Sequence, residues 1–147
     1  MTLTIRPFRP EDQSAVRALA LAGLAEHFAQ PDAAMNPDLD DIWGAYPARG
    51  HCFLVAEAEG AIVASGALLV NGDAGQLARV SVAPGWRRRG VARAIVKRLL
   101  GEARRAGLAR AWMETNDDWD PAIRLYMACG FTPFDHRDGC TFMCIDL

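Results

Sequence analysis

The chain has 147 residues, of which 51% are hydrophobic and 23% charged, with a formal net charge of −2. This length is typical of one domain, and the composition excludes a disordered or low-complexity protein. The charge is uneven, because residues 87–110 carry nine basic side chains and one acid while the remainder is acidic. This pattern indicates either a local anion site or a helix with a solvated basic face, rather than a general nucleic-acid surface.

The chain start lacks the basic stretch and apolar core of a secretory signal. The longest mainly apolar run, residues 61–70, is shorter than the roughly 20 residues that a membrane span needs. We therefore expect a cytoplasmic protein without membrane association. Its cysteines are expected to be reduced and mostly buried, and since none forms a Cys-x-x-Cys pair, a zinc ribbon is not expected. They are Cys52, Cys129, Cys140 and Cys144.

The first part of the chain is predicted to hold one strand and two helices. Residues 3–7 alternate in polarity, as a strand does. A helix follows from Pro10 to about Gln30, with Gly23 as a point where it could be interrupted. Residues 31–37 are a predicted loop. Residues 38–46 are a predicted short helix with apolar side chains on one side.

Three consecutive strands are predicted next. Residues 52–57 and 61–69 read as a β-hairpin closed by the turn Glu59-Gly60. A third strand runs over residues 76–82, and Pro84-Gly85 ends it.

The last part alternates helices and strands. Apolar residues at helical spacing predict a long helix from Gly90 to about Ala106. A strand at 111–115, a helix from Pro121 to Cys129 and two strands, one starting at Phe131 and one at 141–145, complete the chain. The order β-α-α-β-β-β-α-β-α-β-β indicates an α/β fold: one domain, residues 1–147, with a mixed β-sheet flanked by helices.

A strand, a turn and the start of a helix meet in residues 80–92. Helix starts present unpaired N–H groups and a partial positive charge, so they bind phosphates readily. Three arginines precede the helix, and Gly90 and Ala92 leave room for close approach of a ligand. The segment lacks the glycine patterns of ATP-type or dinucleotide-binding loops. Local chemistry alone leaves a phosphate site and an ordinary amphipathic helix start equally open.

Two segments resemble a known family. Arg87-Arg88-Arg89-Gly90-Val91-Ala92 resembles the Gln/Arg-x-x-Gly-x-Gly/Ala motif of the GNAT superfamily of N-acetyltransferases, whose amides hold the pyrophosphate of acetyl-CoA. Residues 122–131 are similar to the family's Ala-x-x-Leu-Tyr-x-x-x-Gly-Phe segment. The two motifs have the family's order and separation, and the predicted elements match the family fold over nearly the whole chain. The resemblance implies a GNAT-like domain that transfers acetyl groups.

The resemblance also implies roles for individual residues. The strand around Val80 and Val82 would pair with the pantetheine arm through its main chain, and the amides from Arg88 to Ala92 would hold the pyrophosphate. Arg87 would add a side-chain contact, and Asn116 would reach the pantetheine. The implied cofactor-binding set is Val80, Val82, Arg87, Arg88, Arg89, Gly90, Val91, Ala92 and Asn116.

Tyr126 matches the general acid of the family, which would protonate the departing CoA thiolate. Its other interpretation is a helix residue with its ring in the core and its hydroxyl at the edge. The main-chain N–H of Val82 is the candidate donor to the oxyanion. Glu114 lies on the strand beside the implied cleft and could serve as base, although a structural or ion-paired carboxylate is favoured there, and the base is left unassigned.

The resemblance implies an acceptor site bordered by the predicted helix at residues 38–46, which is acidic and aromatic, as is the loop after Thr115. An acidic cleft would attract a cationic amine of a small molecule or peptide, but aspartates in such places are usually caps or solvated loop residues. Aromatic residues at helical spacing likewise belong more often to a core. The candidates are Asp38, Asp40, Asp41, Asp117, Asp118, Asp120, Trp43, Tyr46 and Trp119.

No metal site and no covalent enzyme intermediate are expected. The three histidines, His27, His51 and His136, have no ligand spacing, and Ser65 and Ser81 lie in strands without a nucleophile elbow. Two other functions compete with the transferase: a catalytically silent acyl-CoA-binding module, and a nucleic-acid-binding protein that uses the basic segment. Dimerisation is common in the family that the chain resembles, so a homodimer is left open.

Overall fold

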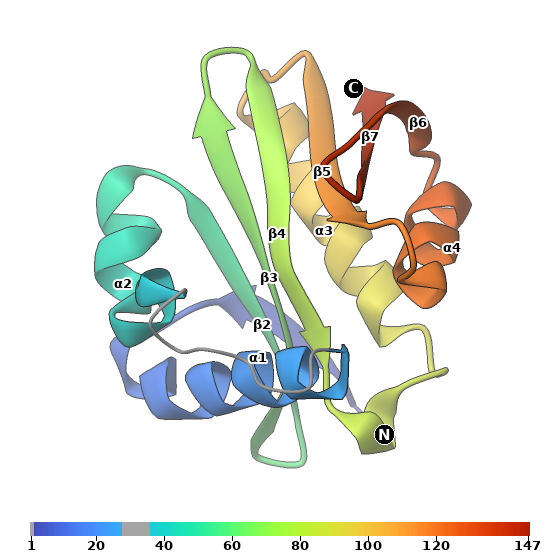
Figure 1. The fold of residues 1–147 in the computed structure, drawn as a ribbon. Coiled ribbons are helices and arrows are strands. Elements are labelled where there is room, and N and C mark those ends of the chain that lie inside the picture. The colour runs from blue at the N-terminus through green and yellow to red at the C-terminus, as the bar shows by residue number, and fades with distance from the viewer. Residues whose placement is uncertain (1, 28–35) are drawn as a thin grey trace.

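The computed structural model describes residues 2–27 and 36–147 (Figure 1). Within these residues the strands form one sheet of seven, in the order β1-β2-β3-β4-β5-β7-β6. All neighbouring pairs are antiparallel except β4 and β5, which are parallel. The strands are β1 Thr4–Pro7, β2 Cys52–Ala58, β3 Ala61–Asn71, β4 Ala74–Val82, β5 Arg110–Asn116, β6 Thr132–Arg137 and β7 Cys140–Asp146.

Helices cover both faces of the sheet (Figure 1). On one face, α1 (Gln13–His27) and α2 (Ile42–Ala45) pack against β2 and β3 around Val16, Ile42 and Phe53. On the other face, α3 (Val91–Arg105) and α4 (Asp120–Ala128) bury a larger core. The expected mixed sheet flanked by helices is therefore confirmed. No helix of the described residues is both long enough and apolar enough to cross a membrane.

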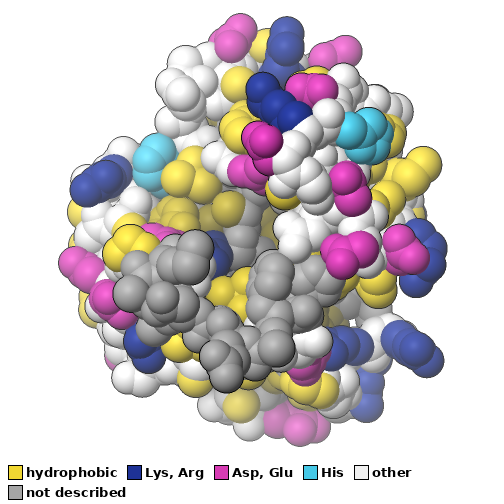
Figure 2. All heavy atoms as spheres, viewed as in Figure 1, with side chains coloured by type: hydrophobic (Ala, Val, Ile, Leu, Met, Phe, Trp, Pro, Cys, Tyr) yellow, Lys and Arg dark blue, Asp and Glu magenta, His cyan; other side chains and the backbone are white. Residues whose placement is uncertain are grey.

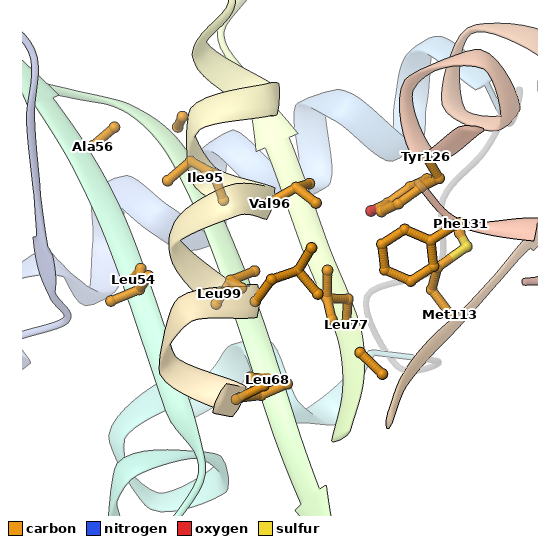
Figure 3. Close-up of a cluster of buried hydrophobic side chains, with 14 of the residues drawn as sticks. Leu54, Ala56, Leu68, Leu77, Ile95, Val96, Leu99, Met113, Tyr126 and Phe131 are labelled. Carbon is orange, nitrogen blue, oxygen red and sulfur yellow. The ribbon is translucent and has the colours of Figure 1, made fainter. Parts of the chain in front are cut away.

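Helix α3 is the centre of the larger core (Figure 3). Ile95, Val96 and Leu99 are fully buried against the sheet, as the helical spacing of apolar residues predicts. The helix lies unusually close to β3 because Gly66 has no side chain there. A Cβ at Gly66 would lie 2.5 Å from Ile95 Cγ2. This close packing of α3 on β3 fixes the position of the helix relative to the strands that carry the candidate site.

Strands β4 and β5 diverge after a short parallel contact. They pair only over Ala74–Gln76 and Arg110–Trp112, although β4 continues to Val82 and β5 to Asn116. A bulge in β4 contributes to this divergence, because the β3–β4 register shifts by one residue between Ser65 and Ala67. The bulge includes Arg79, whose φ of 56° lies in the left-handed region. Bulges bend and twist a strand, so the two strands separate and leave an opening.

The predicted single helix over residues 38–46 is wrong. The structure has a 3-10 helix at Pro37–Asp40, the one-turn α2, and a second 3-10 helix at Pro47–Arg49. Asp41 separates the first two, with an extended φ of −149° and a side chain that caps α2 by accepting from the Gly44 N–H. Pro47 then opens the next short helix.

Smaller differences follow from turn chemistry. Gly23 does not interrupt α1, which runs through it. Strand β3 continues to Asn71 and strand β4 begins at Ala74, so both are longer than predicted. The turn between them takes only two residues, Gly72 and Asp73. The predicted end of the first helix and most of the loop after it lie outside the described residues.

Candidate active site

A cleft of about 730 Å³ occupies the opening between β4 and β5. Its walls come from α1, β4, the segment before α3, the first turn of α3, β5 and α4. Of the site residues expected from the sequence, eight line it: Val80, Val82, Arg87, Arg88, Gly90, Val91, Ala92 and Tyr126. Arg89 and Asn116 are not among the lining residues. The two sequence motifs, far apart in the chain, therefore meet at one cleft.

The start of α3 forms one end of the cleft. Gly90 is the residue before the helix and has a φ of 77°, a conformation that side chains other than glycine adopt only with strain. No side chain caps this end, and the N–H of Ala94 is the first to bond back to Gly90, at 3.0 Å. The amides of the preceding turn therefore have no partner within the helix. Together with the helix dipole they favour an anion.

The arginines before α3 have different environments. Arg87 Nη1 forms an ion pair with Glu26 Oε2 of α1 at 2.6 Å, and its Nε donates to the Val82 carbonyl at 3.2 Å. Arg88 lines the cleft with a φ of 61°. The Arg89 guanidinium stacks over the Trp86 ring at 5.0 Å. Of the three arginines, Arg87 and Arg88 thus line the cleft and Arg89 does not.

The edge of β4 toward the cleft is not paired with another described strand beyond Gln76, although the Val82 carbonyl accepts from Arg87. The N–H of Ala83 donates to the Val63 carbonyl at 2.8 Å, so the strand faces β3 at this residue. Because hydrogen-bonding direction alternates along a strand, Val82 and Val80 direct their N–H and C=O groups to the open side. An extended ligand can add to this edge as a further strand.

Tyr126 lies between the cleft and the core. Its ring packs edge-to-face on Phe131, with centroids 5.4 Å apart, and the residue is 6% exposed. Burial, with a smaller effect of Cys129, raises the pKa of Tyr126 above its usual value near 10. In Figure 3 the hydroxyl points from α4 toward α3 and β4. The ring lies in the core, as the second interpretation expected, and the residue also lines the cleft, while its role as general acid stays a prediction.

Glu114 lines the cleft from β5 with an exposed side chain. It forms no ion pair with any of the described residues, which leaves its carboxylate open to a ligand. Ala111 and Met113 of the same strand are buried under α3 and α4. Since side chains alternate along a strand, Glu114 points to the opposite face, the one that bears α1 and α2.

A polar cluster borders the same face, and two of its members, Asp38 and Tyr46, are among the candidates named from the sequence, whereas Arg79 is not. Arg79, at the bulge of β4, binds both carboxylate oxygens of Asp38 at 2.7 and 2.9 Å, and the Tyr46 hydroxyl donates to Asp38 at 2.6 Å. Although burial opposes it, hydrogen bonding by Arg79 and Tyr46 holds the pKa of Asp38 below its usual range. Burial and the bond to Asp38 raise the pKa of Tyr46 to about 12. The only sign of the role of Arg79 in the sequence was that it is a single arginine within a mainly apolar predicted strand.

Several of the remaining candidates form hydrogen bonds or ion pairs with other side chains of the protein. Asp40 pairs with Arg17 at 3.3 Å, and Asp117 accepts from the buried Thr141 hydroxyl at 2.6 Å. Trp119 lines the cleft, whereas Trp43 is 46% exposed and does not. Asn116 accepts a weak bond from Cys140 Sγ at 3.8 Å. Among residues 2–27 and 36–147, no group of three or more His, Cys, Asp or Glu side chains is arranged to hold a metal ion.

Comparison with known proteins gives a consistent result. The model of the acetyltransferase (GNAT) family matches residues 18–131. The uncharacterized N-acetyltransferase YjgM of Escherichia coli strain K12 is 31% identical over 110 residues, which cover 72% of this chain and 66% of that protein. The chain spans about half to two thirds of the length of the curated relatives it matches.

Solved structures share the whole fold. A GNAT-family acetyltransferase of Staphylococcus aureus Mu50 superimposes with a TM-score of 0.91 at 17% identity, over 99% of both chains. The PaiA N-acetyltransferase of Thermoplasma acidophilum, solved in complex with coenzyme A, gives a TM-score of 0.87 at 14% identity, over the full length of both. At these identities the similarity shows the fold alone.

Proposed function

Because the chain belongs to the acetyltransferase (GNAT) family, we propose that it moves an acetyl group from acetyl-CoA directly to a primary amine of a small molecule or peptide. The observation that carries this proposal is the cleft between β4 and β5, where the uncapped start of α3, a free strand edge and Tyr126 meet. The similar fold solved with coenzyme A supports the choice of ligand.

The two halves of the cleft suit the two parts of acetyl-CoA. The amides at the start of α3, with Arg87 and Arg88, would hold the pyrophosphate. The backbone of Val80 and Val82 would pair with the pantetheine arm as an added strand. Arg89 and Asn116 stay predicted contacts.

The bound thioester supplies an activated acetyl group, and the chain supplies the donors that its transfer requires. The Val82 N–H points to the open edge and can stabilise the oxyanion that forms as the amine attacks. The Tyr126 hydroxyl, kept protonated by burial, gives its proton to the departing sulfur. Glu114 attracts the cationic amine to the opposite side of the cleft. The amine gives one proton to solvent before it attacks, and the second proton, lost as the amide forms, restores the tyrosine hydroxyl.

Calorimetric titration with acetyl-CoA tests the proposal. We expect saturable one-to-one binding, followed by release of free thiol when a suitable amine is added. The absence of both heat and thermal stabilisation at millimolar acetyl-CoA would refute the acetyl-CoA site. Binding without thiol release across a broad amine panel would instead favour the catalytically silent acyl-CoA-binding module.

The ion pair between Glu26 and Arg87 predicts a gain of affinity. Both side chains are about half exposed and lie at the anion-binding end of the cleft. Glu26→Gln removes a negative charge there and releases Arg87, so we expect acetyl-CoA to bind about two- to fivefold more tightly at low salt. The gain should shrink as ionic strength rises. Glu11→Gln, an exposed acid outside the cleft, is the matched control. Equal or weaker binding in Glu26→Gln would contradict the placement of Arg87.

A further inference from the structure

A second cavity, of about 430 Å³, lies on the face of the sheet that bears Glu114. It is lined by Trp112 and Arg110 of β5, Phe134 and Arg137 of β6 and Phe142 of β7, and we call it the aromatic cavity. Trp112 points to this face because its neighbours Ala111 and Met113 are buried under α3 and α4. Figure 2 shows this face of the molecule, with hydrophobic side chains at the floor of a hollow beside α2.

The walls of the aromatic cavity combine flat rings with positive charge. Trp112 stacks on Phe142 with centroids 6.3 Å apart, and Phe134 meets Phe142 edge-on at 6.3 Å. Phe134 is 55% exposed, an unusual state for a large apolar side chain. Arg137 lies over the Phe142 ring at 4.4 Å. Such walls favour a planar apolar group that carries a negative charge.

The charge of the aromatic cavity is positive. Neither Asp nor Glu is among the residues that line it within the described part of the chain. Arg110 has no ion pair with any described side chain. Arg137 pairs with Asp135 at 3.4 Å, but both side chains are well exposed, and such surface pairs contribute little. An anion entering the cavity therefore meets the guanidinium of Arg110, which has no such pair, and that of Arg137, whose ion pair with Asp135 is exposed to solvent.

The aromatic cavity adjoins the first cleft at Glu114. This residue lines the cleft and pairs with Phe142 across the β5–β7 ladder, and Phe142 lines the aromatic cavity. Trp112 lies two residues from Glu114 on the same face, about 7 Å along the strand. Arg137 reaches in from β6, two strands from β5, which is about 10 Å across the sheet. One small ligand can therefore span from the carboxylate to Arg137.

We propose that the aromatic cavity is the second half of the acceptor site, and that the acceptor is an amine carrying an aromatic ring with an anionic group beyond it. This inference rests on the proposed function for the role of the amine. The ammonium end lies at Glu114, the ring lies against Trp112, Phe134 and Phe142, and the anionic end meets Arg137, two strands across the sheet from Glu114. The opposite charges at the two ends fix the direction in which the acceptor lies, with its amine toward the cleft.

Binding is tested first without acetyl transfer. We titrate the protein with 3-phenylpropionate and, separately, with its uncharged amide. The acid should bind with a Kd on the order of 1 mM, as expected for a fragment of this size, and the amide several-fold more weakly. Arg137→Gln and Phe134→Ala should each weaken binding of the acid by about three- to tenfold. Matched controls are Arg104→Gln and Met127→Ala, exposed residues outside both cavities.

Transfer is tested second, with 3-(4-aminomethylphenyl)propionate against 4-methylbenzylamine, which lacks the carboxylate. Thiol release should show at least about a tenfold higher kcat/KM for the carboxylate-bearing amine, and Arg137→Gln should remove the difference. Acetyl-CoA binding should be the same in all of these variants. If the unaltered protein did not bind acetyl-CoA, the proposed transferase function would be refuted. The fragment titration tests the aromatic cavity as a binding site independently of that function. Equal binding of acid and amide, or binding indifferent to Arg137→Gln, overturns the proposal.

Discussion

Tyr126→Phe is expected to lower kcat for acetyl transfer by roughly 100-fold, while the Kd for acetyl-CoA changes by less than about twofold. The substitution removes only the hydroxyl, so the edge-to-face packing on Phe131 is retained. The thiolate must then leave without a proton donor from the enzyme. A rate loss without an affinity loss identifies an interaction made only in the transition state.

The pH profile provides a second check on Tyr126. Its raised pKa keeps the hydroxyl protonated, and so able to donate, beyond pH 10. The wild-type rate should therefore show no fall caused by ionisation of this tyrosine below that pH. Thermal unfolding of Tyr126→Phe serves as the control for folding. An unchanged kcat in a stably folded variant would assign Tyr126 to the core alone and favour the silent acyl-CoA-binding module.

Periodicity and turn residues sufficed to predict most of the fold. The apolar spacing in residues 91–103 predicts the buried face of α3, because a helix repeats its core positions every three to four residues. The helix was predicted to start at Gly90 and starts at Val91, with Gly90 immediately before it at a φ of 77°. Local rules of this kind require no knowledge of distant contacts, and therefore a single sequence is enough for them.

The parts that the sequence did not reveal depend on contacts between distant segments. The left-handed conformation of Arg79 has no local signature, since the bulge appears only when β4 pairs with β3. Its partner Asp38 lies 41 residues away. The aromatic cavity likewise takes its rings from three strands, and Trp112, Phe134 and Phe142 meet only through the β5-β7-β6 order.

The short helices around α2 show a different limit. A stripe of apolar residues over 38–46 suggested one helix, yet Asp41 divides this segment, and Pro47 begins a further short helix directly after it. Here capping chemistry overrides periodicity, because an aspartate that bonds to a following N–H competes with helical pairing. The same division leaves Asp38 free to bind Arg79 and so to border the acceptor face.

Gly90→Glu is expected to weaken acetyl-CoA binding by at least about 100-fold. Two effects act together at this position. A φ of 77° costs a side chain about 1–3 kcal/mol unless the turn relaxes, and relaxation moves the amides that face the anion. The new carboxylate would also lie beside those amides and compete with the pyrophosphate for them. A Cβ at Gly90 meets no atom within 4 Å, so the fold itself should persist.

Two matched variants separate these effects. Gly90→Ala has the backbone strain without the charge, and we expect it to lose only a few-fold in acetyl-CoA affinity. Gly101→Glu places the same charge on the same helix at a position with open space and ordinary helical backbone, and its affinity should be unchanged. Calorimetry of the three variants, with thermal unfolding beside it, gives both readouts. If Gly90→Glu bound acetyl-CoA within about threefold of the unaltered protein, the start of α3 would not be the anion site, and the pyrophosphate would have to lie elsewhere along the cleft.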